Sequence, residues 1–265
     1  MAVKAVWLVA LSAVCVSAIS AQTPVRYTRD LCVKVQPGKG PEYAAMLHDV
    51  SAKLAQVRVD EGKLGWWLAE RAVVPAGTAA RCDYHLVSFY EGFPPEPPTP
   101  AENDAVYQKA KINMTSADMS AKLTALTTLV NIDIWRGVAA VGGPDKGSYV
   151  RMNLYKANPG QAAEWAKLET EGWKPMVEAY AKENPGFGWA AASLALPAGT
   201  SLHYNAMTVD IFPKWAAVGT GIPVTTEWPK VHADLPFADY MGRVNKTVDR
   251  YRVEVYQIVE MVRGK

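Results

Sequence analysis

The sequence has 265 residues, of which 49% are hydrophobic and 20% charged, and it carries a formal net charge of +2. Hydrophobic and charged fractions close to those of globular proteins exclude a disordered chain, a collagen-like fibre and a polytopic membrane protein. So small a net charge also argues against a nucleic-acid-binding protein, because such proteins neutralise phosphates with a surplus of Lys and Arg.

The N-terminal segment has the layout of a secretory signal peptide. Lys4 supplies a positive charge, an apolar run follows, and Ala18-Ile19-Ser20-Ala21 offers small residues to a signal peptidase. The apolar run is too short for a transmembrane helix, which needs about 20 apolar residues. We therefore predict that residues 1–21 are a signal peptide and that the mature chain is secreted or periplasmic. Cleavage after Ser20 fits the small-residue requirement as well as cleavage after Ala21. An uncleaved N-terminal anchor is the alternative.

The rest of the sequence repeats itself at a constant offset. Pro75-Ala76-Gly77-Thr78 recurs 122 positions later as Pro197-Ala198-Gly199-Thr200, and a Pro-Gly pair and a Trp recur at the same offset. Chance does not easily produce four consecutive identities in register with other matches. We therefore predict a tandem repeat of two modules, residues 22–143 and 144–265, each of a typical small-domain size.

Both modules show the same order of predicted elements. In the first, we predict a strand at 27–35, a helix around 47–57, strands at 66–74 and 84–90, a helix around 119–129 and a strand around 132–134. The strands are rich in β-branched and aromatic residues, and the helices carry apolar residues three or four positions apart. The second module ends in the same way, with a helix around 241–248 and a strand around 253–259. The order is βαββαβ, twice.

This order is that of a ferredoxin-like module, in which both helices lie on one face of a four-stranded antiparallel sheet. The other face of the sheet has to be covered, and two copies in one chain can bury these faces against each other. The predicted fold class is therefore α+β, with two tandem βαββαβ ferredoxin-like modules packed as a pseudo-dimeric α+β barrel.

In its element order and its repeated Pro-Gly, Trp and Pro-Ala-Gly-Thr landmarks, the sequence resembles the dimeric α+β barrel superfamily in its tandem, single-chain form. It looks most like the uncharacterised exported members. Other members are cofactor-independent quinone-forming monooxygenases, haem-degrading monooxygenases, chlorite-dismutase-like haem proteins and muconolactone isomerases. The resemblance implies no single activity, because one fold carries many functions.

Strand alternation predicts which side chains line the barrel lumen. We expect the apolar Val150, Met152 and Leu154 to meet the helices, and the alternate positions to point inward. The expected inward residues are Tyr27, Arg29, Leu31 and Val33; Asn131, Asp133 and Trp135; Tyr149, Arg151, Asn153 and Tyr155; and Arg252, Glu254 and Tyr256. Because the first and fourth strands of the module are neighbours, Arg29 is expected to meet Asp133, and Arg151 to meet Glu254.

Two interpretations of these lumen residues stay open. The arginines can hold a carboxylate or enolate of a ligand, or they can form ion pairs that close the barrel end. Likewise, a set of aromatic residues can form the walls of a ligand pocket or simply pack as core: Trp67, Trp135, Trp189, Tyr84, Tyr149 and Tyr155.

Asn153 has no polar counterpart in the first module, where Leu31 takes its position. The resemblance implies that Asn153 and Trp189 correspond to an inward Asn and a Trp used by some monooxygenases of the superfamily. A buried amide that serves only the core is the alternative. If one half of the barrel keeps a site, the second module is the better candidate.

Cysteine and histidine give a weaker signal. Cys32 and Cys82 lie on strands that are adjacent in the module, so an oxidising compartment allows a disulfide between them; two buried thiols are the alternative. The four histidines lack metal-binding spacing, so we predict no metal site. His232 is either a haem ligand, as in haem-binding relatives, or a packing residue. Neither a nucleophile elbow nor a phosphate-binding loop occurs, and we predict no cofactor.

These observations predict an exported small-molecule-binding α+β barrel protein of unknown substrate, acting as a cofactor-independent oxygenase or isomerase. Arg151 would stabilise an oxyanion, Glu254 would orient Arg151, and Asn153 would donate a hydrogen bond. The alternative is a non-catalytic periplasmic ligand-binding or structural barrel protein, so the sequence leaves open whether the chain is an enzyme. The expected partner is a small molecule, with no nucleic acid, no membrane span after signal cleavage, and a monomer or weak homo-oligomer.

Overall fold

The computed structural model describes residues 26–264, and the predicted signal peptide lies outside them. In the first half of the chain the elements are β1 (Arg26–Val35), α1 (Gly40–Met46), the π-helix η1 (Leu47–Ser51), α2 (Ala52–Asp60), β2 (Trp66–Val74), the 3-10 helix η2 (Gly77–Ala79), β3 (Tyr84–Glu91), α3 (Pro100–Lys109), α4 (Ser116–Leu126) and β4 (Thr127–Val141).

Within the described residues, the second half has the corresponding elements except η2, and it has one additional helix. They are β5 (Tyr149–Ala157), α5 (Ala162–Lys167), the π-helix η3 (Leu168–Trp173), α6 (Lys174–Glu183), β6 (Gly188–Leu196), β7 (Ala206–Phe212), α7 (Trp215–Thr220), α8 (Val224–Val231), α9 (Phe237–Thr247) and β8 (Val248–Arg263). The helices α3 and α7 were not predicted. Helix α3 begins at the end of the Pro-rich stretch 94–100, whose composition suggests extended chain.

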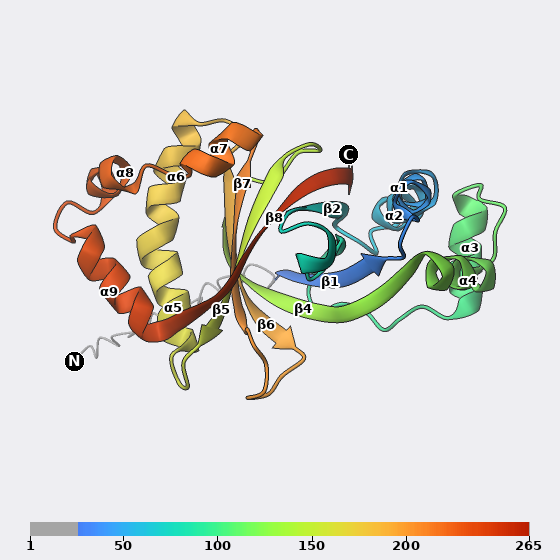
Figure 1. The fold of residues 1–265 in the computed structure, drawn as a ribbon, viewed down its shortest axis with the longest axis horizontal. Coiled ribbons are helices and arrows are strands. Elements are labelled where there is room, and N and C mark those ends of the chain that lie inside the picture. The colour runs from blue at the N-terminus through green and yellow to red at the C-terminus, as the bar shows by residue number, and fades with distance from the viewer. Residues whose placement is uncertain (1–25, 265) are drawn as a thin grey trace, which may run out of the picture.

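The eight strands form one closed antiparallel barrel in the order β1-β3-β2-β8-β5-β7-β6-β4. Each half contributes a sheet of ferredoxin-like order, β4-β1-β3-β2 or β8-β5-β7-β6, and the two sheets are hydrogen-bonded to each other through the pairs β2–β8 and β4–β6. Figure 1 shows α1 to α4 on one side of the strands and α5, α6, α8 and α9 on the other. The predicted α+β fold class, with two ferredoxin-like units in a pseudo-dimeric barrel, is confirmed.

Local signals fix where the first helix of each half begins. Gly38 and Gly160 adopt φ values of 77° and 76° in the turn after β1 and β5, a left-handed conformation that favours glycine. The Pro-Gly pairs of the sequence therefore end a strand and start a helical segment in both halves. Further along the chain, α3 begins at a capping box in which Thr99 and Glu102 satisfy each other's backbone N–H groups.

The interior of the barrel is lined by the face of β5 that we expected to meet the helices. Val150, Met152 and Leu154 are buried there among strands of both halves, with Leu68 and Tyr256 among their neighbours. The alternate residues of β5 face the helices of the second half instead. This expectation was wrong because both faces of β5 are buried, so that polarity does not identify the face that meets the helices.

The orientation of β1 was also reversed. Val33 packs with Tyr43 and Met46 of α1, so Arg29 and Leu31 on the same face of the strand point towards the helices. The fourth strands have the predicted orientation, since Trp135 of β4 and Tyr256 of β8 share one cluster inside the barrel. An arginine and its expected carboxylate partner consequently lie on opposite faces of the sheet, and the predicted pairs Arg29–Asp133 and Arg151–Glu254 do not form.

Two further cores lie between the sheets and their helices. Trp67 belongs to the core under α1, α2 and α4, and Trp189 to the core under α5, α6, α8 and α9. Both side chains therefore serve as packing residues in the two helix-facing layers. Within residues 26–264, none of the helices combines the length and apolarity needed to cross a membrane.

Candidate functional site

The candidate functional site is a pocket of about 270 Å³ between the second sheet and its helices. Its walls come from β5 (Arg151, Asn153, Tyr155), η3 (Glu169, Trp173), β7 (Thr208, Asp210), α9 (Tyr240, Met241, Val244) and β8 (Arg250, Val253). Three of the predicted site residues, Arg151, Asn153 and Tyr155, thus meet in one place. They meet on the helix side of the sheet and not in the barrel lumen, because the face of β5 is reversed.

Asp210 is the centre of the polar wall. Its Oδ2 accepts hydrogen bonds from Nε of Arg151 at 3.1 Å and from Nδ2 of Asn153 at 3.2 Å. The β5–β7 register places Arg151 directly opposite Asp210, which explains the pair. Burial raises the pKa of the Asp210 carboxyl, whereas the Arg151 guanidinium opposes this rise. The carboxylate that orients Arg151 is therefore Asp210, and the prediction of Glu254 for this role was wrong.

Glu169 is the second acid of the pocket. It lies in the π-helix η3 and is only 6% exposed. Burial raises the pKa of its carboxyl to about 8, and the neighbouring Asp210 carboxylate contributes to the rise. At pH 7 the Glu169 side chain is therefore mostly protonated, and near pH 8 it can either donate or accept a proton. A buried acid of this kind beside a pocket is a common mark of a functional site.

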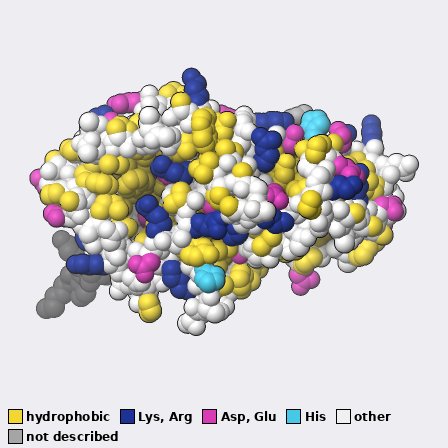
Figure 2. All heavy atoms as spheres, viewed as in Figure 1, with side chains coloured by type: hydrophobic (Ala, Val, Ile, Leu, Met, Phe, Trp, Pro, Cys, Tyr) yellow, Lys and Arg dark blue, Asp and Glu magenta, His cyan; other side chains and the backbone are white. Residues whose placement is uncertain are grey.

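The remaining walls combine aromatic rings with a second cation. The guanidinium of Arg250, an exposed residue, lies 5.7 Å from the centre of the Tyr155 ring. Trp173 and Tyr240 provide further aromatic surface from the helical side. The lining thus includes two arginines, Arg151 and Arg250. On the face of the molecule that Figure 2 draws, Lys and Arg side chains gather over the strands in the middle. The pocket therefore offers positive charge and flat apolar walls to a ligand.

The corresponding region of the first half is filled with apolar side chains. Counting back 122 positions from Asn153, Tyr155, Glu169 and Thr208 leads to Leu31, Val33, Leu47 and Leu86. Val33 and Leu47 are buried in the core under α1, and Leu86 packs against it. Arg29, the counterpart of Arg151, donates to the Tyr90 hydroxyl at 2.8 Å. The polar pocket described above belongs to the second half. The sequence favoured this half because Asn153 has no polar counterpart in the first half.

The two acids of the pocket, Asp210 and Glu169, were missed by the sequence reasoning, as were the residues of α9 and β8 that line it. Asp210 could have been found from the alternation of its strand, which places it beside Thr208 on the face that carries Arg151 on the neighbouring strand. Glu169 was detectable as an acid within the apolar stripe of a helix, at a position where the first module has Leu47. A charged residue in such a stripe is rarely fully buried without a reason.

Other predicted site residues lie inside the barrel, in a buried polar network. Nδ1 of His85 lies 2.6 Å from Oδ1 of Asp30, and its Nε2 lies 3.1 Å from the Tyr256 hydroxyl. Tyr256 in turn donates to Glu254 at 2.9 Å. The imidazole therefore links β1, β3 and β8, and with them the two halves of the barrel.

The outer layer of this network holds two arginines. Arg252 lies 2.8 Å from Oε1 of Glu254, and Arg81 lies 3.5 Å from Oε2 of the same carboxylate. Asp133 accepts a hydrogen bond from Tyr204 at 2.7 Å. One of the two interpretations expected arginines to form ion pairs inside the barrel. Such ion pairs occur, but their guanidinium groups come from Arg81 and Arg252 and not from Arg29 and Arg151.

Several predicted ligand-binding residues do not reach the pocket. Trp67 and Trp189 pack in the helix-facing cores, and Trp135 packs inside the barrel with Tyr256. Tyr149 packs against Trp215 with 5.3 Å between the ring centres. These aromatic residues therefore follow the core-packing interpretation.

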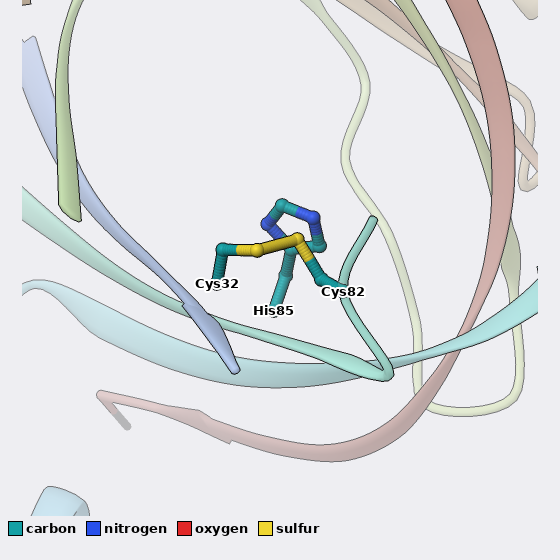
Figure 3. A group of neighbouring side chains, drawn as sticks. All are labelled: Cys32, Cys82 and His85. Carbon is teal, nitrogen blue, oxygen red and sulfur yellow. A yellow bond between two sulfur atoms is a disulfide. The ribbon is translucent and has the colours of Figure 1, made fainter. Parts of the chain in front are cut away.

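Cys32 and Cys82 form a disulfide with a Cα–Cα distance of 5.2 Å, next to the imidazole of His85 (Figure 3). The two sulfurs and a ring nitrogen of His85 lie within 4.8 Å of one another. Metal ions bind cysteine as the thiolate, so the disulfide form of this cluster does not provide a metal site. The disulfide instead ties β1 to the segment that leads into β3.

Neither a protein-family model nor a curated protein matches this sequence. Among solved structures, a candidate monooxygenase from Fusobacterium nucleatum is similar at 12% identity and a TM-score of 0.53, covering 90% of this chain and 94% of its own. A candidate monooxygenase from Lactobacillus acidophilus is similar at 9% identity and a TM-score of 0.55, covering 91% and 97%. With the closed eight-stranded barrel and its strand order, these likenesses show that the chain has the fold of the dimeric α+β barrel superfamily.

Proposed function

We propose that the chain is an oxygenase-type enzyme that acts on a small, acidic organic molecule bound in the pocket of the second half. The observation that carries the proposal is the pair of buried acids in that pocket, Glu169 with a pKa raised to about 8 and Asp210 bound to Arg151. The description of two structural neighbours as candidate monooxygenases supports the same class of reaction.

The charges of the pocket favour an anionic ligand or one that becomes anionic during the reaction. Arg151 is held by Asp210 through Nε and one terminal nitrogen, which orients the guanidinium so that its other terminal nitrogen can donate to a ligand oxygen. Arg250 adds a second positive charge at the rim. A volume of about 270 Å³ lies at the lower end of the range of roughly 300–1,000 Å³ for ligand pockets, so the substrate is small.

The chemistry begins with a proton transfer. Above its pKa, Glu169 can remove a proton from an acidic C–H group, and Arg151 stabilises the enolate or phenolate that results. An activated CH2 group then reacts with molecular oxygen to give a carbonyl group and one molecule of water, and the substrate supplies all four electrons. An isomerase would use the same proton transfer without oxygen. That the reaction requires no cofactor stays a prediction.

Oxygen uptake tests the proposal. The purified mature protein is assayed with a panel of small phenols, carboxylic acids and 1,3-dicarbonyl compounds, with mass spectrometry of the products. For any substrate found, Arg151→Ala and Glu169→Gln should each lower kcat/KM by about 100-fold or more, since each removes a group that stabilises the transition state. Arg29→Ala removes the corresponding arginine of the first half and should leave turnover unchanged.

The alternative is a non-catalytic binding protein that uses the same pocket. This alternative is supported by a ligand that binds the wild type more tightly than Arg151→Ala, causes no oxygen uptake and is recovered unchanged. The same result contradicts the proposal that the chain is an enzyme. Full turnover in the Arg151→Ala and Glu169→Gln variants contradicts the assignment of the site.

We also propose that the chain is exported and cleaved after Ala21. The support is the composition of the N-terminal segment and the disulfide, which is typical of oxidising compartments. N-terminal sequencing of the protein recovered from a periplasmic or culture fraction tests this. A protein that starts at Met1 and stays in the cytoplasmic fraction contradicts it.

Size-exclusion chromatography of the same material tests the expected monomer or weak homo-oligomer.

A further inference from the structure

The π-helix η3 and the helix α9 meet at Gly172 and Tyr240. A Cβ atom added to Gly172 would overlap Cε2 of Tyr240 and lie only 3.0 Å from its Cδ2, so that the ring or the helix would have to shift. Tyr240 is 1% exposed, so its ring cannot turn out into solvent without disturbing its neighbours. The present position of the ring therefore requires glycine at residue 172.

Side chains from α9 and from the end of α8 also bind the backbone of η3. The Tyr240 hydroxyl donates to the carbonyl oxygen of Leu168 at 3.3 Å, and Nε2 of His232 donates to the carbonyl oxygen of Gly172 at 2.8 Å. These are near the first and the last residues of the π-helix. His232 thus has a packing role here, and its ring lies 4.2 Å from that of Trp228.

Glu169 lies between these two attachment points. It follows Leu168 directly and precedes Gly172 by three residues, so any shift of η3 relative to α9 moves the carboxyl group that faces the pocket. π-helical turns interrupt the regular hydrogen bonding of a helix and often occur at functional sites.

The first half of the chain has a π-helix at the corresponding place but a different composition. In η1, Leu47 and Val50 occupy the positions 122 residues before Glu169 and Gly172, and both are buried in the apolar core. Glycine is therefore not needed for the π-helix itself. The combination of an acid with a glycine occurs in the half that has the polar pocket.

We propose that Gly172 and Tyr240 are positioning residues, whose contact sets the place of η3 and so holds the Glu169 carboxyl in the pocket and away from bulk water. The inference rests on the proposed function only in treating this pocket as the active site. Gly172 and Tyr240 act through Glu169, so the experiment can follow the Glu169 carboxyl directly, without a substrate.

The experiment is a pH titration by NMR of the full mature protein carrying ¹³C-labelled glutamate side chains. Burial raises the pKa of Glu70 as well as that of Glu169 to about 8, so the Glu169→Gln variant is used to assign the Glu169 signal. Gly172→Ala should displace the Tyr240 ring or η3 and admit water, which lowers the pKa of Glu169 by about one unit or more. Tyr240→Phe keeps the ring against Gly172 and loses only the hydrogen bond to Leu168, so its titration should lie closer to that of the wild type than to that of Gly172→Ala.

Two further variants serve as controls. Gly242 lies on α9 with open space around it, so Gly242→Ala should leave the titration of Glu169 unchanged. In a Tyr240→Ala background, Gly172→Ala should have no additional effect, because the ring that it would strike is absent.

An unchanged Glu169 titration in folded Gly172→Ala overturns the inference, and so does an equal effect of Gly172→Ala in the Tyr240→Ala background. If Gly172→Ala does not fold, Tyr240→Ala decides, since an unchanged titration in that variant also overturns it. If the titrations follow the expectation but the substrate panel gives no turnover, the proposed function fails and the positioning role stands.

Discussion

Arg151 on β5 lies directly opposite Asp210 on β7, and Nε and one terminal nitrogen of the guanidinium lie 3.1 and 3.0 Å from the same carboxylate oxygen. Asn153 donates to that oxygen as well. One buried carboxylate therefore orients two neighbouring residues of β5, and the shape of the polar wall depends on it. The first half has Ser88, which is not an acid, at the position 122 residues before Asp210.

Asp210→Ala should lower the free energy of unfolding by about 2 kcal/mol, because it leaves the Arg151 guanidinium and the Asn153 amide without their buried acceptor. Urea denaturation at pH 7 measures the change. Ser88→Ala, at the matching position of the first half, should change the stability by less than about 0.5 kcal/mol. Equal effects of the two substitutions would mean that Asp210 does not hold this wall together.

Glu169 should make the stability of the protein depend on pH. Its pKa is about 8 in the folded chain and near 4.5 in the unfolded chain, so the folded state binds more protons between these values. Stability from this group is thus fully present below about pH 4.5 and is lost as the pH rises to about 8. Glu169→Gln removes this loss, and the variant should be more stable than the wild type at pH 9 by up to about 5 kcal/mol.

Denaturation of both proteins at pH 5 and pH 9 measures this difference. Glu70 contributes to the pH dependence of both proteins alike, so the comparison isolates Glu169. Glu164→Gln, an exchange in the preceding helix α5 at a side chain that is 40% exposed, should show no such pH-dependent difference. A Glu169→Gln variant that loses stability with pH as steeply as the wild type contradicts the raised pKa.

The order of the elements was predictable because it depends on local signals. Pro-Gly turns, β-branched strands and apolar helical stripes are each visible within a few residues, and their order βαββαβ leads to the barrel. The orientation of β1 and β5 was not predictable in this way. Strands with two buried faces contain apolar residues on both, and only the tertiary structure decides whether Met152 or Asn153 faces the lumen.

The candidate site was predicted in part for the same reason. Arg151, Asn153 and Tyr155 were found because they share one face of β5. Residues that share a face stay together even when the whole strand faces the other way. Their partners were not found, because Asp210 and Glu169 come from elements whose packing against β5 depends on that orientation. The carboxylate predicted to orient Arg151, Glu254, is on the other side of the sheet.

His85 should be important for stability, although its side chain does not line the pocket. It is fully buried, and its Nδ1 lies 2.6 Å from the buried Asp30 carboxylate. His85→Ala leaves Asp30 and Tyr256 without this partner and creates a cavity, so it should lower the free energy of unfolding by about 3 kcal/mol or more. Chemical denaturation at pH 7 measures it.

His48→Ala is the matched control for this substitution. The His48 side chain is 67% exposed where it contacts Glu260, so its removal should cost less than about 0.5 kcal/mol. A small effect of His85→Ala, comparable to that of His48→Ala, would show that the network inside the barrel adds little to its stability.

The disulfide between Cys32 and Cys82 should stabilise the barrel by restricting the unfolded chain. It closes a loop of 50 residues, for which the chain-entropy model gives about 4 kcal/mol at 25 °C. The double variant Cys32→Ala/Cys82→Ala should therefore unfold at a lower urea concentration than the oxidised wild type. Both cysteines are at most 1% exposed, so the folded protein should also resist mild reductants. Thiol counting on the denatured mature protein without reductant should find no reactive thiol; two reactive thiols, or equal stability of the double variant, would contradict the disulfide.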